Sequence, residues 1–258
     1  MTGTSESAAG FGLPAQPDLT PEEARGLLER GELDVQGRLA DASNTTLFCV
    51  ATLDGVSAMC VYKPIAGERP LWDFPDGTLA GREVATYVVS EATGWDIVPP
   101  TVMREGPFGP GMCQLWVDVD EEADLGLLVR SDHPDLRRMV VLDAVVNNAD
   151  RKGGHLLPRP DGRIQGVDHG VTFSDEDKLR TVLWGFRGRP LSDDAVDVLA
   201  KLDALLDPGC SSDLVESLGL HLTRREVTRT RVRVRRLLRD GVYPHPRGDW
   251  PPVPWPAF

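Results

Sequence analysis

The chain has 258 residues, enough for one large domain or two small lobes with a hydrophobic core. Its hydrophobic content of 41% and charged content of 26% are those of an ordinary globular protein. The formal net charge of −12 excludes nucleic acid and anionic membrane surfaces as expected partners, because both repel an acidic protein.

Three features of the sequence predict a soluble, cytoplasmic protein. No apolar run approaches the roughly 18 residues of a membrane-spanning helix, so no integral membrane association is expected. Residues 1–18 lack the basic start and apolar centre of a signal peptide and are predicted to be a disordered tail. The cysteines form no C-x-x-C pair, so we expect buried thiols and neither disulfides nor a zinc site. They are Cys49, Cys60, Cys113 and Cys210.

The next part of the chain, residues 19–118, is predicted to be an N-lobe rich in strands. Thr20 as N-cap and Pro21 as the first helical residue indicate a helix start. Between two apolar runs, Asp54-Gly55 indicates a hairpin. The predicted elements are a helix over 18–33, strands between Gly37 and Tyr62, a helix over 79–95, and strands over 96–105 and 111–119.

Residues 119–245 are predicted to be a mainly helical C-lobe, with the boundary between the lobes near 117–126. Apolar periodicity predicts helices over 133–148, 192–206, 211–220 and 223–241. The tail, residues 246–258, is too rich in proline for regular structure, although Trp250 and Trp255 are expected to dock on the body.

Four charged residues occur in the order that phosphoryl transfer requires. This reaction needs cations that neutralise phosphates, ligands for Mg²⁺ and a carboxylate that orients the attacking hydroxyl. Lys63 ends an apolar strand, and Glu83 lies on the following helix, where it could pair with Lys63. Asp150 follows an apolar helix in a polar loop. Asp168 stands in an Asp-x-Gly motif and is expected to bind metal, while Gly170 supplies turn freedom.

These stretches resemble the phosphatidylinositol 3/4-kinase-like superfamily, and their motifs are most similar to those of the type II phosphatidylinositol 4-kinases. "DAVVNNADRKGGHLL" and "GVDHGVTF" resemble the catalytic and metal loops. "VYKPIAGERP", "GREVATYVVSEATGWDIVPPTV" and "CQLWV" resemble the lysine strand, the following helix and the hinge strand. The resemblance covers roughly residues 37–175. It implies an α+β, two-lobed protein-kinase-like fold, with a small β-rich N-lobe containing one helix and a mainly helical C-lobe.

The resemblance also implies a role for each matching residue. Asp150 would be the catalytic base and Asp168 the principal ligand of Mg²⁺ or Mn²⁺. Lys63 would bind the phosphates of ATP in the cleft between the lobes, held there by Glu83. The other implied nucleotide contacts are Ser43, Asn44 and Thr45 in the phosphate-covering loop 40–48, and Gln114, Leu115, Trp116 and Val117 in the adenine hinge.

One position departs from the family pattern. The superfamily has a metal-binding Asn five residues after the catalytic Asp, and here that residue is His155. Imidazole suits Mn²⁺ or Zn²⁺ better than Mg²⁺. Three readings are open: His155 ligates a softer metal, it hydrogen-bonds a phosphate or Asp168 without touching metal, or catalysis is impaired. We favour the second.

The neighbours of Asp150 have simpler interpretations. Arg151 is expected to be a structural residue buried against a carboxylate. Asn147 and Asn148 would end the preceding helix and hydrogen-bond the loop backbone. The glycines at 153 and 154 fit a tight turn.

The segment 224–239, with eight Arg and one Glu, has two possible readings. It could bind nucleic acid or phosphoinositide. The preferred alternative is an amphipathic helix, with Val227, Val234 and Leu238 inward and arginines that balance an acidic body.

The sequence therefore predicts an ATP-dependent kinase that acts on a hydroxyl of a protein or a small polar metabolite. A lipid acceptor is disfavoured because Asp175, Glu176 and Asp177 dilute the basic residues that follow Asp168. Two alternatives stay open. One is a nucleotide-binding pseudokinase that acts as a signalling scaffold, suggested by His155 and the lack of a glycine-rich loop. The other is a nucleotidyl (AMP) transferase on the same fold.

Overall fold

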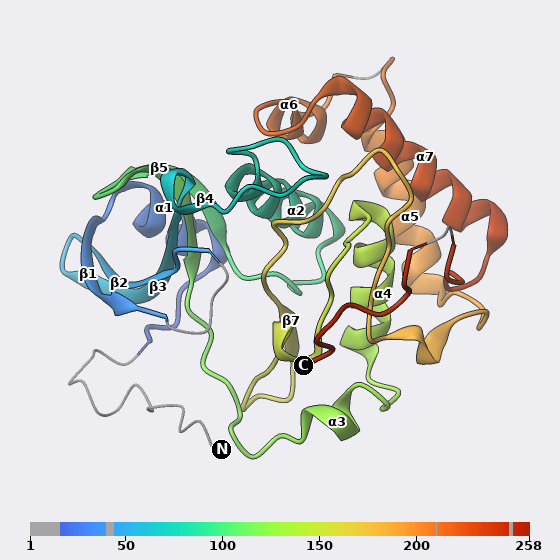
Figure 1. The fold of residues 1–258 in the computed structure, drawn as a ribbon, viewed down its shortest axis with the longest axis horizontal. Coiled ribbons are helices and arrows are strands. Elements are labelled where there is room, and N and C mark those ends of the chain that lie inside the picture. The colour runs from blue at the N-terminus through green and yellow to red at the C-terminus, as the bar shows by residue number, and fades with distance from the viewer. Residues whose placement is uncertain (1–15, 40–43, 210, 248–249) are drawn as a thin grey trace. The chain divides into compact units, whose positions relative to one another are not determined.

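The structure is a computed structural model that describes residues 16–39, 44–209, 211–247 and 250–258 (Figure 1). Predictions for Ser43, Cys210 and the tail before residue 16 lie outside the described residues. The chain forms two compact units. Unit 1 comprises Met1–Gly67 and Pro100–Trp116, and unit 2 comprises Glu68–Pro99 and Val117–Phe258.

Unit 1 is an antiparallel five-stranded sheet with one helix. The strand order is β1-β2-β3-β5-β4. Leu27 and Leu28 of the helix pack on buried side chains of the sheet. The elements are α1 (Pro21–Arg30), β1 (Glu32–Arg38), β2 (Leu47–Leu53), β3 (Val56–Pro64), β4 (Thr101–Gly106) and β5 (Gly109–Leu115).

Local signals explain most of unit 1. Thr20 forms a capping box with Glu23, and Pro21 is the first helical residue, which confirms the predicted helix start. Asp54 and Gly55 have positive φ angles of 50° and 82°, as a tight hairpin turn requires, which confirms the predicted hairpin. Two boundaries were predicted wrongly.

The helix prediction extended too far, and β1 was missed. Gly31 ends α1 in an extended conformation, and β1 follows directly with a mostly exposed side-chain pattern that gives little periodic signal. The strand predicted over 96–105 begins only at Thr101. Asp96 has a positive φ of 52°, and Pro100 lacks an N–H for a ladder.

The described cysteines are free and buried, as predicted: Cys49, Cys60 and Cys113. Burial raises the pKa of the Cys49 thiol to about 12, so this thiol stays protonated at neutral pH.

Unit 2 is mainly helical. Its core surrounds α4, whose Leu136, Met139 and Val141 are fully buried. Helices α2 and α7 both contact α4. A helix that is covered on several sides needs apolar residues around most of its circumference, and α4 has them. The short α3 and the two-stranded β6-β7 hairpin were not predicted. The elements are α2 (Leu79–Thr93), α3 (Leu125–Leu128), α4 (Pro134–Val146), β6 (Leu156–Pro158), β7 (Ile164–Gly166), α5 (Asp193–Leu205), α6 (Asp213–Gly219) and α7 (Arg224–Asp240).

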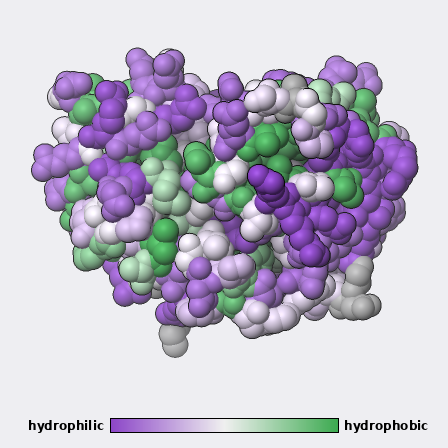
Figure 2. Space-filling model, turned by 90° about the horizontal axis from the view of Figure 1, so that it is seen from above, coloured by the Kyte–Doolittle hydropathy of each residue, from purple (hydrophilic) through white to green (hydrophobic). Residues whose placement is uncertain are grey.

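Helix α7 carries the arginine-rich segment, and its amphipathic interpretation is confirmed. Val234 and Leu237 are buried in the core, while Val227 and Leu238 are partly buried against it. Figure 2 shows the hydrophilic surface over α7, on the right of that view. Most of its arginines pair with carboxylates of unit 2, so they balance acidic groups of the protein itself. The pairs are Arg225–Asp175, Arg231–Asp203, Arg231–Asp207, Arg235–Asp203, Arg236–Asp177 and Arg239–Asp240.

No helix in the part of the chain that the structure describes has both the length and the apolar character needed to cross a bilayer.

Candidate active site

The loop that carries Asp150 begins where α4 ends at Asn147. This residue has the left-handed conformation, with φ 56° and ψ 52°, and its N–H donates to the carbonyl of Asp143. Its side-chain Nδ2 donates to the carbonyls of Ser174 at 3.0 Å and Glu176 at 2.5 Å. Its Oδ1 accepts from the N–H of Lys178 at 3.0 Å. Asn147 thus ends the helix, as predicted, and also holds the 174–178 backbone.

A fully buried ion pair anchors this loop to α4. The Nε and Nη2 atoms of Arg151 donate to the two carboxylate oxygens of Asp143 at 3.0 and 2.9 Å, and neither side chain is exposed. Nδ2 of Asn148 also donates to Asp143, and its Oδ1 accepts from the N–H of Asp150. The predicted structural role of Arg151 is confirmed.

The Asp150 loop, residues 147–155, is tied to the Asp168 loop, residues 167–174. The N–H of Ala149 donates to the carbonyl of Val171 at 3.0 Å. Nη1 of Arg151 donates to the carbonyl of Val167, also at 3.0 Å. Two sequence motifs that are separated along the chain are therefore held side by side.

The conformation of the Asp-x-Gly motif differs from the prediction. The positive φ, 60°, is at Asp168, whereas Gly170 does not adopt the left-handed conformation. Gly170 lies beside α2: a Cβ there would lie 3.4 Å from Cβ of Leu79 and 3.8 Å from Oε1 of Glu83, which are ordinary contact distances. Glu83 is 3% exposed. The Asp168 loop thus lies next to Glu83 of α2.

His155 faces Asp168. Its Nε2 lies 3.3 Å from Oδ2 of the carboxylate, and its Nδ1 lies 3.5 Å from the N–H of Lys152. Burial lowers the pKa of His155 and outweighs the opposing effect of Asp168, so the imidazole is neutral near pH 7. Because Nδ1 faces a donor, the proton belongs on Nε2, toward the carboxylate.

The carboxylates of Asp150 and Asp168 are both accessible. Their side chains are 29% and 47% exposed. Nζ of Lys152 lies 3.0 Å from Oδ2 of Asp150, so a cation stands beside this carboxylate.

The carboxylates at this site suit a metal ion that takes its other ligands from phosphate and water. Within the described residues, no group of three or more His, Cys, Asp or Glu side chains could hold a metal ion. Mg²⁺ commonly takes only one or two protein carboxylates and completes its shell with substrate phosphates and water. The exposed oxygens of Asp168 meet that requirement.

Unit 1 places two of the predicted phosphate-binding regions together. Lys63 lies near the end of β3, opposite Met112 of β5. The predicted phosphate-covering loop returns to the turn after β3, where the N–H of Thr45 donates to the carbonyl of Gly67 at 3.0 Å. Asn44 immediately precedes Thr45 and is half-buried.

The predicted hinge covers the last two residues of β5 and the two residues that follow this strand. The side chain of Gln114 is buried and donates to Oγ1 of Thr101, so it serves the sheet. The N–H of Trp116 donates to the carbonyl of Met59, and the carbonyl of Trp116 accepts from Nε2 of Gln16 at 3.1 Å. Gln114, Leu115 and Trp116 belong to unit 1, and Val117 belongs to unit 2.

Sequence reasoning missed three contributors to these loops. They are Asp143, Lys152 and Gln16. A signal existed for Asp143, because a carboxylate in the middle of an apolar helix needs a partner when that helix is buried. Nothing in the sequence indicated that Gln16 would bond to the backbone of Trp116.

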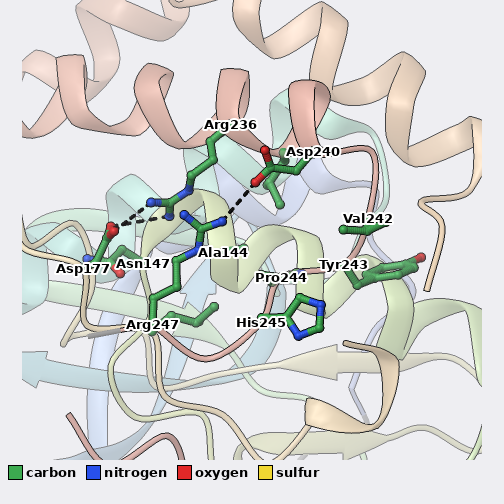
Figure 3. A pocket seen from close by; sticks show the side chains of 12 residues that line it. Ala144, Asn147, Asp177, Arg236, Asp240, Val242, Tyr243, Pro244, His245 and Arg247 are labelled. Carbon is green, nitrogen blue, oxygen red and sulfur yellow. Dashed lines mark hydrogen bonds and ion pairs between the residues drawn. The ribbon is translucent and has the colours of Figure 1, made fainter. Parts of the chain in front are cut away.

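A cavity of about 150 Å³ lies elsewhere in unit 2, and none of the predicted site residues lines it. Figure 3 shows two ion pairs beside it, Arg236 with Asp177 and Arg247 with Asp240. Its lining also includes Leu237 at the end of α7. The cavity reaches the Asp150 loop only at Asn147, which is one of its lining residues.

Comparisons with known proteins support the fold. No protein-family model matches the chain. The solved structure of hydra Fam20 with sugar has a TM-score of 0.55 at 13% identity, and covers 85% of this chain and 87% of that one. The structure of the Helicobacter pylori proinflammatory kinase CtkA has a TM-score of 0.46 at 14% identity, and covers 81% and 98%. The similarity to Fam20 confirms the predicted α+β, protein-kinase-like fold.

A relative from Mycobacterium tuberculosis (strain ATCC 25618 / H37Rv), "Protein Rv2133c", is 43% identical over 273 residues. The match covers 92% of this chain and 96% of the relative. The chain belongs to the same protein family as Rv2133c.

Proposed function

We propose that the protein is an ATP-dependent phosphotransferase, an atypical kinase of the phosphatidylinositol 3/4-kinase-like type. The observation that carries the proposal is the pairing of the Asp150 and Asp168 loops through the Ala149–Val171 hydrogen bond. In a kinase-like fold, this pairing puts an accessible carboxylate for the acceptor beside an accessible carboxylate for a metal.

Asp150 accepts the proton of the acceptor hydroxyl. As the hydroxyl oxygen bonds to the γ-phosphorus of ATP, the bond from that phosphorus to the leaving oxygen of ADP breaks. Asp168 would hold Mg²⁺, which supplies neutralising charge to the phosphates when it is bound. We further propose that Lys63 binds phosphates of ATP.

His155 positions Asp168 and does not ligate the metal in this proposal. A neutral imidazole with its proton on Nε2 can donate to the Asp168 carboxylate, from which it lies 3.3 Å. The carboxylate of Asp168 would supply the metal with oxygen, which a hard cation prefers over the nitrogen of His155.

The proposed acceptor is a hydroxyl of a protein or of a small polar metabolite in the cytoplasm. Asp175 and Asp177 follow the Asp168 loop and occupy Arg225 and Arg236 in ion pairs, and the net charge of −12 disfavours an acidic lipid headgroup. Hydra Fam20 was solved with sugar, and a sugar hydroxyl belongs to this acceptor class.

A nucleotide-binding pseudokinase is the second candidate. The contact between His155 and Asp168 favours it, because this imidazole occupies part of the coordination space of the metal-binding carboxylate.

Label transfer separates the two candidates. The purified protein is incubated with cell extract, Mg²⁺ or Mn²⁺, and ATP labelled on either the α- or the γ-phosphate. A kinase transfers only the γ-label, a nucleotidyl transferase only the α-label, and a pseudokinase neither while ATP still raises its Tm. Asp150→Asn is the control. Equal γ-label transfer by wild type and this variant would refute the proposed role of Asp150.

A further inference from the structure

The C-terminal residues 250–258, here called the strap, are bound to unit 2 without helix or strand structure. The carbonyl of Pro252 accepts from the N–H of Thr181 at 3.0 Å and from Nε1 of Trp184 at 2.7 Å. Arg180 donates to the carbonyls of Pro251 and Val253. Proline has no N–H to donate, and the carbonyls of Pro251, Pro252 and Val253 serve here as acceptors.

The segment that receives the strap also supports the Asp150 loop. The N–H of Arg151 donates to the carbonyl of Arg180 at 3.1 Å, and the N–H of Arg180 donates to the carbonyl of Asn148 at 2.9 Å. The N–H of Val182 donates to the carbonyl of Arg151 at 3.1 Å. Residues 180–182 are therefore held between the loop and the strap.

The end of the strap touches the Asp150 loop directly. The N–H of Gly153 donates to the carbonyl of Ala257 at 2.8 Å. The ring of Phe258 lies against Gly153 so closely that a Cβ there would come within 2.1 Å of the ring. A Cβ on Gly154 would meet nothing within 4 Å. An added Cβ at Gly153 would therefore displace the ring of Phe258, whereas one at Gly154 would not.

The strap contributes little to the core. Trp250 docks on Trp72, with ring centroids 5.6 Å apart, but Trp255 is 90% exposed, so its predicted docking is wrong. Phe258 is also 59% exposed. A segment with few buried apolar contacts opens more readily than the core it rests on.

We propose that Ala257 is a positioning residue for phosphoryl transfer, through the hydrogen bond that its carbonyl accepts from Gly153. This inference rests on the proposed function. The strap holds Gly153, and thereby fixes the turn between Asp150 and His155, while its middle holds residues 180–182 against the other side of the loop. When the strap is released, the Asp150 loop loses its contact at Gly153 and the support that residues 180–182 give it. The chemical step then slows, while ATP binding by other residues is retained.

Two neighbouring glycines give a matched test. Gly153→Ala forces Phe258 away, and we expect kcat to fall about tenfold with the KM for ATP little changed, as for a misplaced catalytic group. Gly154→Ala is expected to keep the wild-type kcat. Adding Phe258→Ala to Gly153→Ala removes the clash and is expected to restore much of the lost kcat. A wild-type kcat in Gly153→Ala, an equal loss in Gly154→Ala, or no restoration in the double variant would overturn the proposal.

Hydrogen exchange separates this proposal from the proposed function. Deletion of the strap is expected to speed exchange of the Gly153 and Thr181 amides, whose acceptors it supplies. If the wild type shows no phosphoryl transfer, the proposed function is refuted. The exchange rates of these two amides would then still test whether the strap holds the Asp150 loop. Unchanged exchange at both amides after the deletion would overturn the positioning role.

Discussion

Arg151→Met should be among the most destabilising substitutions in unit 2. It leaves the carboxylate of Asp143 buried without its counter-charge, since both side chains are 0% exposed. It also removes a donor from the carbonyl of Val167. Breaking a buried pair by removing one partner costs about 3–5 kcal/mol. For a chain of this size that predicts a fall in Tm of about 6–20 °C.

The assay is thermal unfolding followed by circular dichroism. Arg235→Met is the matched control, because Arg235 is 58% exposed and pairs with Asp203 at the surface. Such a pair contributes about 0–1 kcal/mol. Combining Arg151→Met with Asp143→Leu removes both charges and should recover part of the loss. Equal Tm values for Arg151→Met and Arg235→Met would refute the reasoning. It would also be refuted if the double variant were less stable than Arg151→Met by the full free energy of a second, independent substitution.

The other predictions concern three residues. Asn147→Ala should cost about 2–3 kcal/mol in urea unfolding, since three hydrogen bonds worth about 1 kcal/mol each are lost; a loss below 1 kcal/mol would contradict this. Burial raises the pKa of Glu226, but bonds from its capping box and from Arg82 outweigh this effect and hold the pKa below its usual value. Its stabilisation is therefore present above about pH 4.3, the unfolded value, and is lost as the pH falls through the lower folded pKa. Glu226→Gln should lower Tm at pH 7 but match wild type at low pH, and a pH-independent difference would refute this. His155→Ala should slow turnover with Mg²⁺ and Mn²⁺ alike, because His155 supports Asp168; a loss confined to Mn²⁺ would instead make His155 a metal ligand.

The sequence predicted elements where local chemistry determines them. The capping box of Thr20 and the Asp54-Gly55 turn are examples, because each feature is specified within four residues. The order of motifs also led to the kinase-like fold, which the comparison with hydra Fam20 confirms. Strand β1 was missed because most of its side chains are exposed, so its formation depends on pairing with β2.

The candidate site shows the same division. The sequence predicted that Arg151 is buried against a carboxylate, but which carboxylate it meets, Asp143, depends on the packing of α4. Turn freedom was expected from Gly170, because glycine adopts a positive φ most easily, whereas the structure has the positive φ at Asp168. The strap could not be foreseen, since Gly153 and Phe258 lie more than a hundred residues apart and only the fold brings them together.

The central claim is that Lys63, and Asp168 through a metal ion, bind the phosphates of ATP. Calorimetric titration with Mg²⁺ and ATP tests it directly in wild type, Lys63→Met and Asp168→Asn. Each substitution should weaken binding by about 1.5–3 kcal/mol, the value of a charge-assisted hydrogen bond, which corresponds to about a 10- to 150-fold rise in Kd. Wild-type affinity in either variant would contradict the claim.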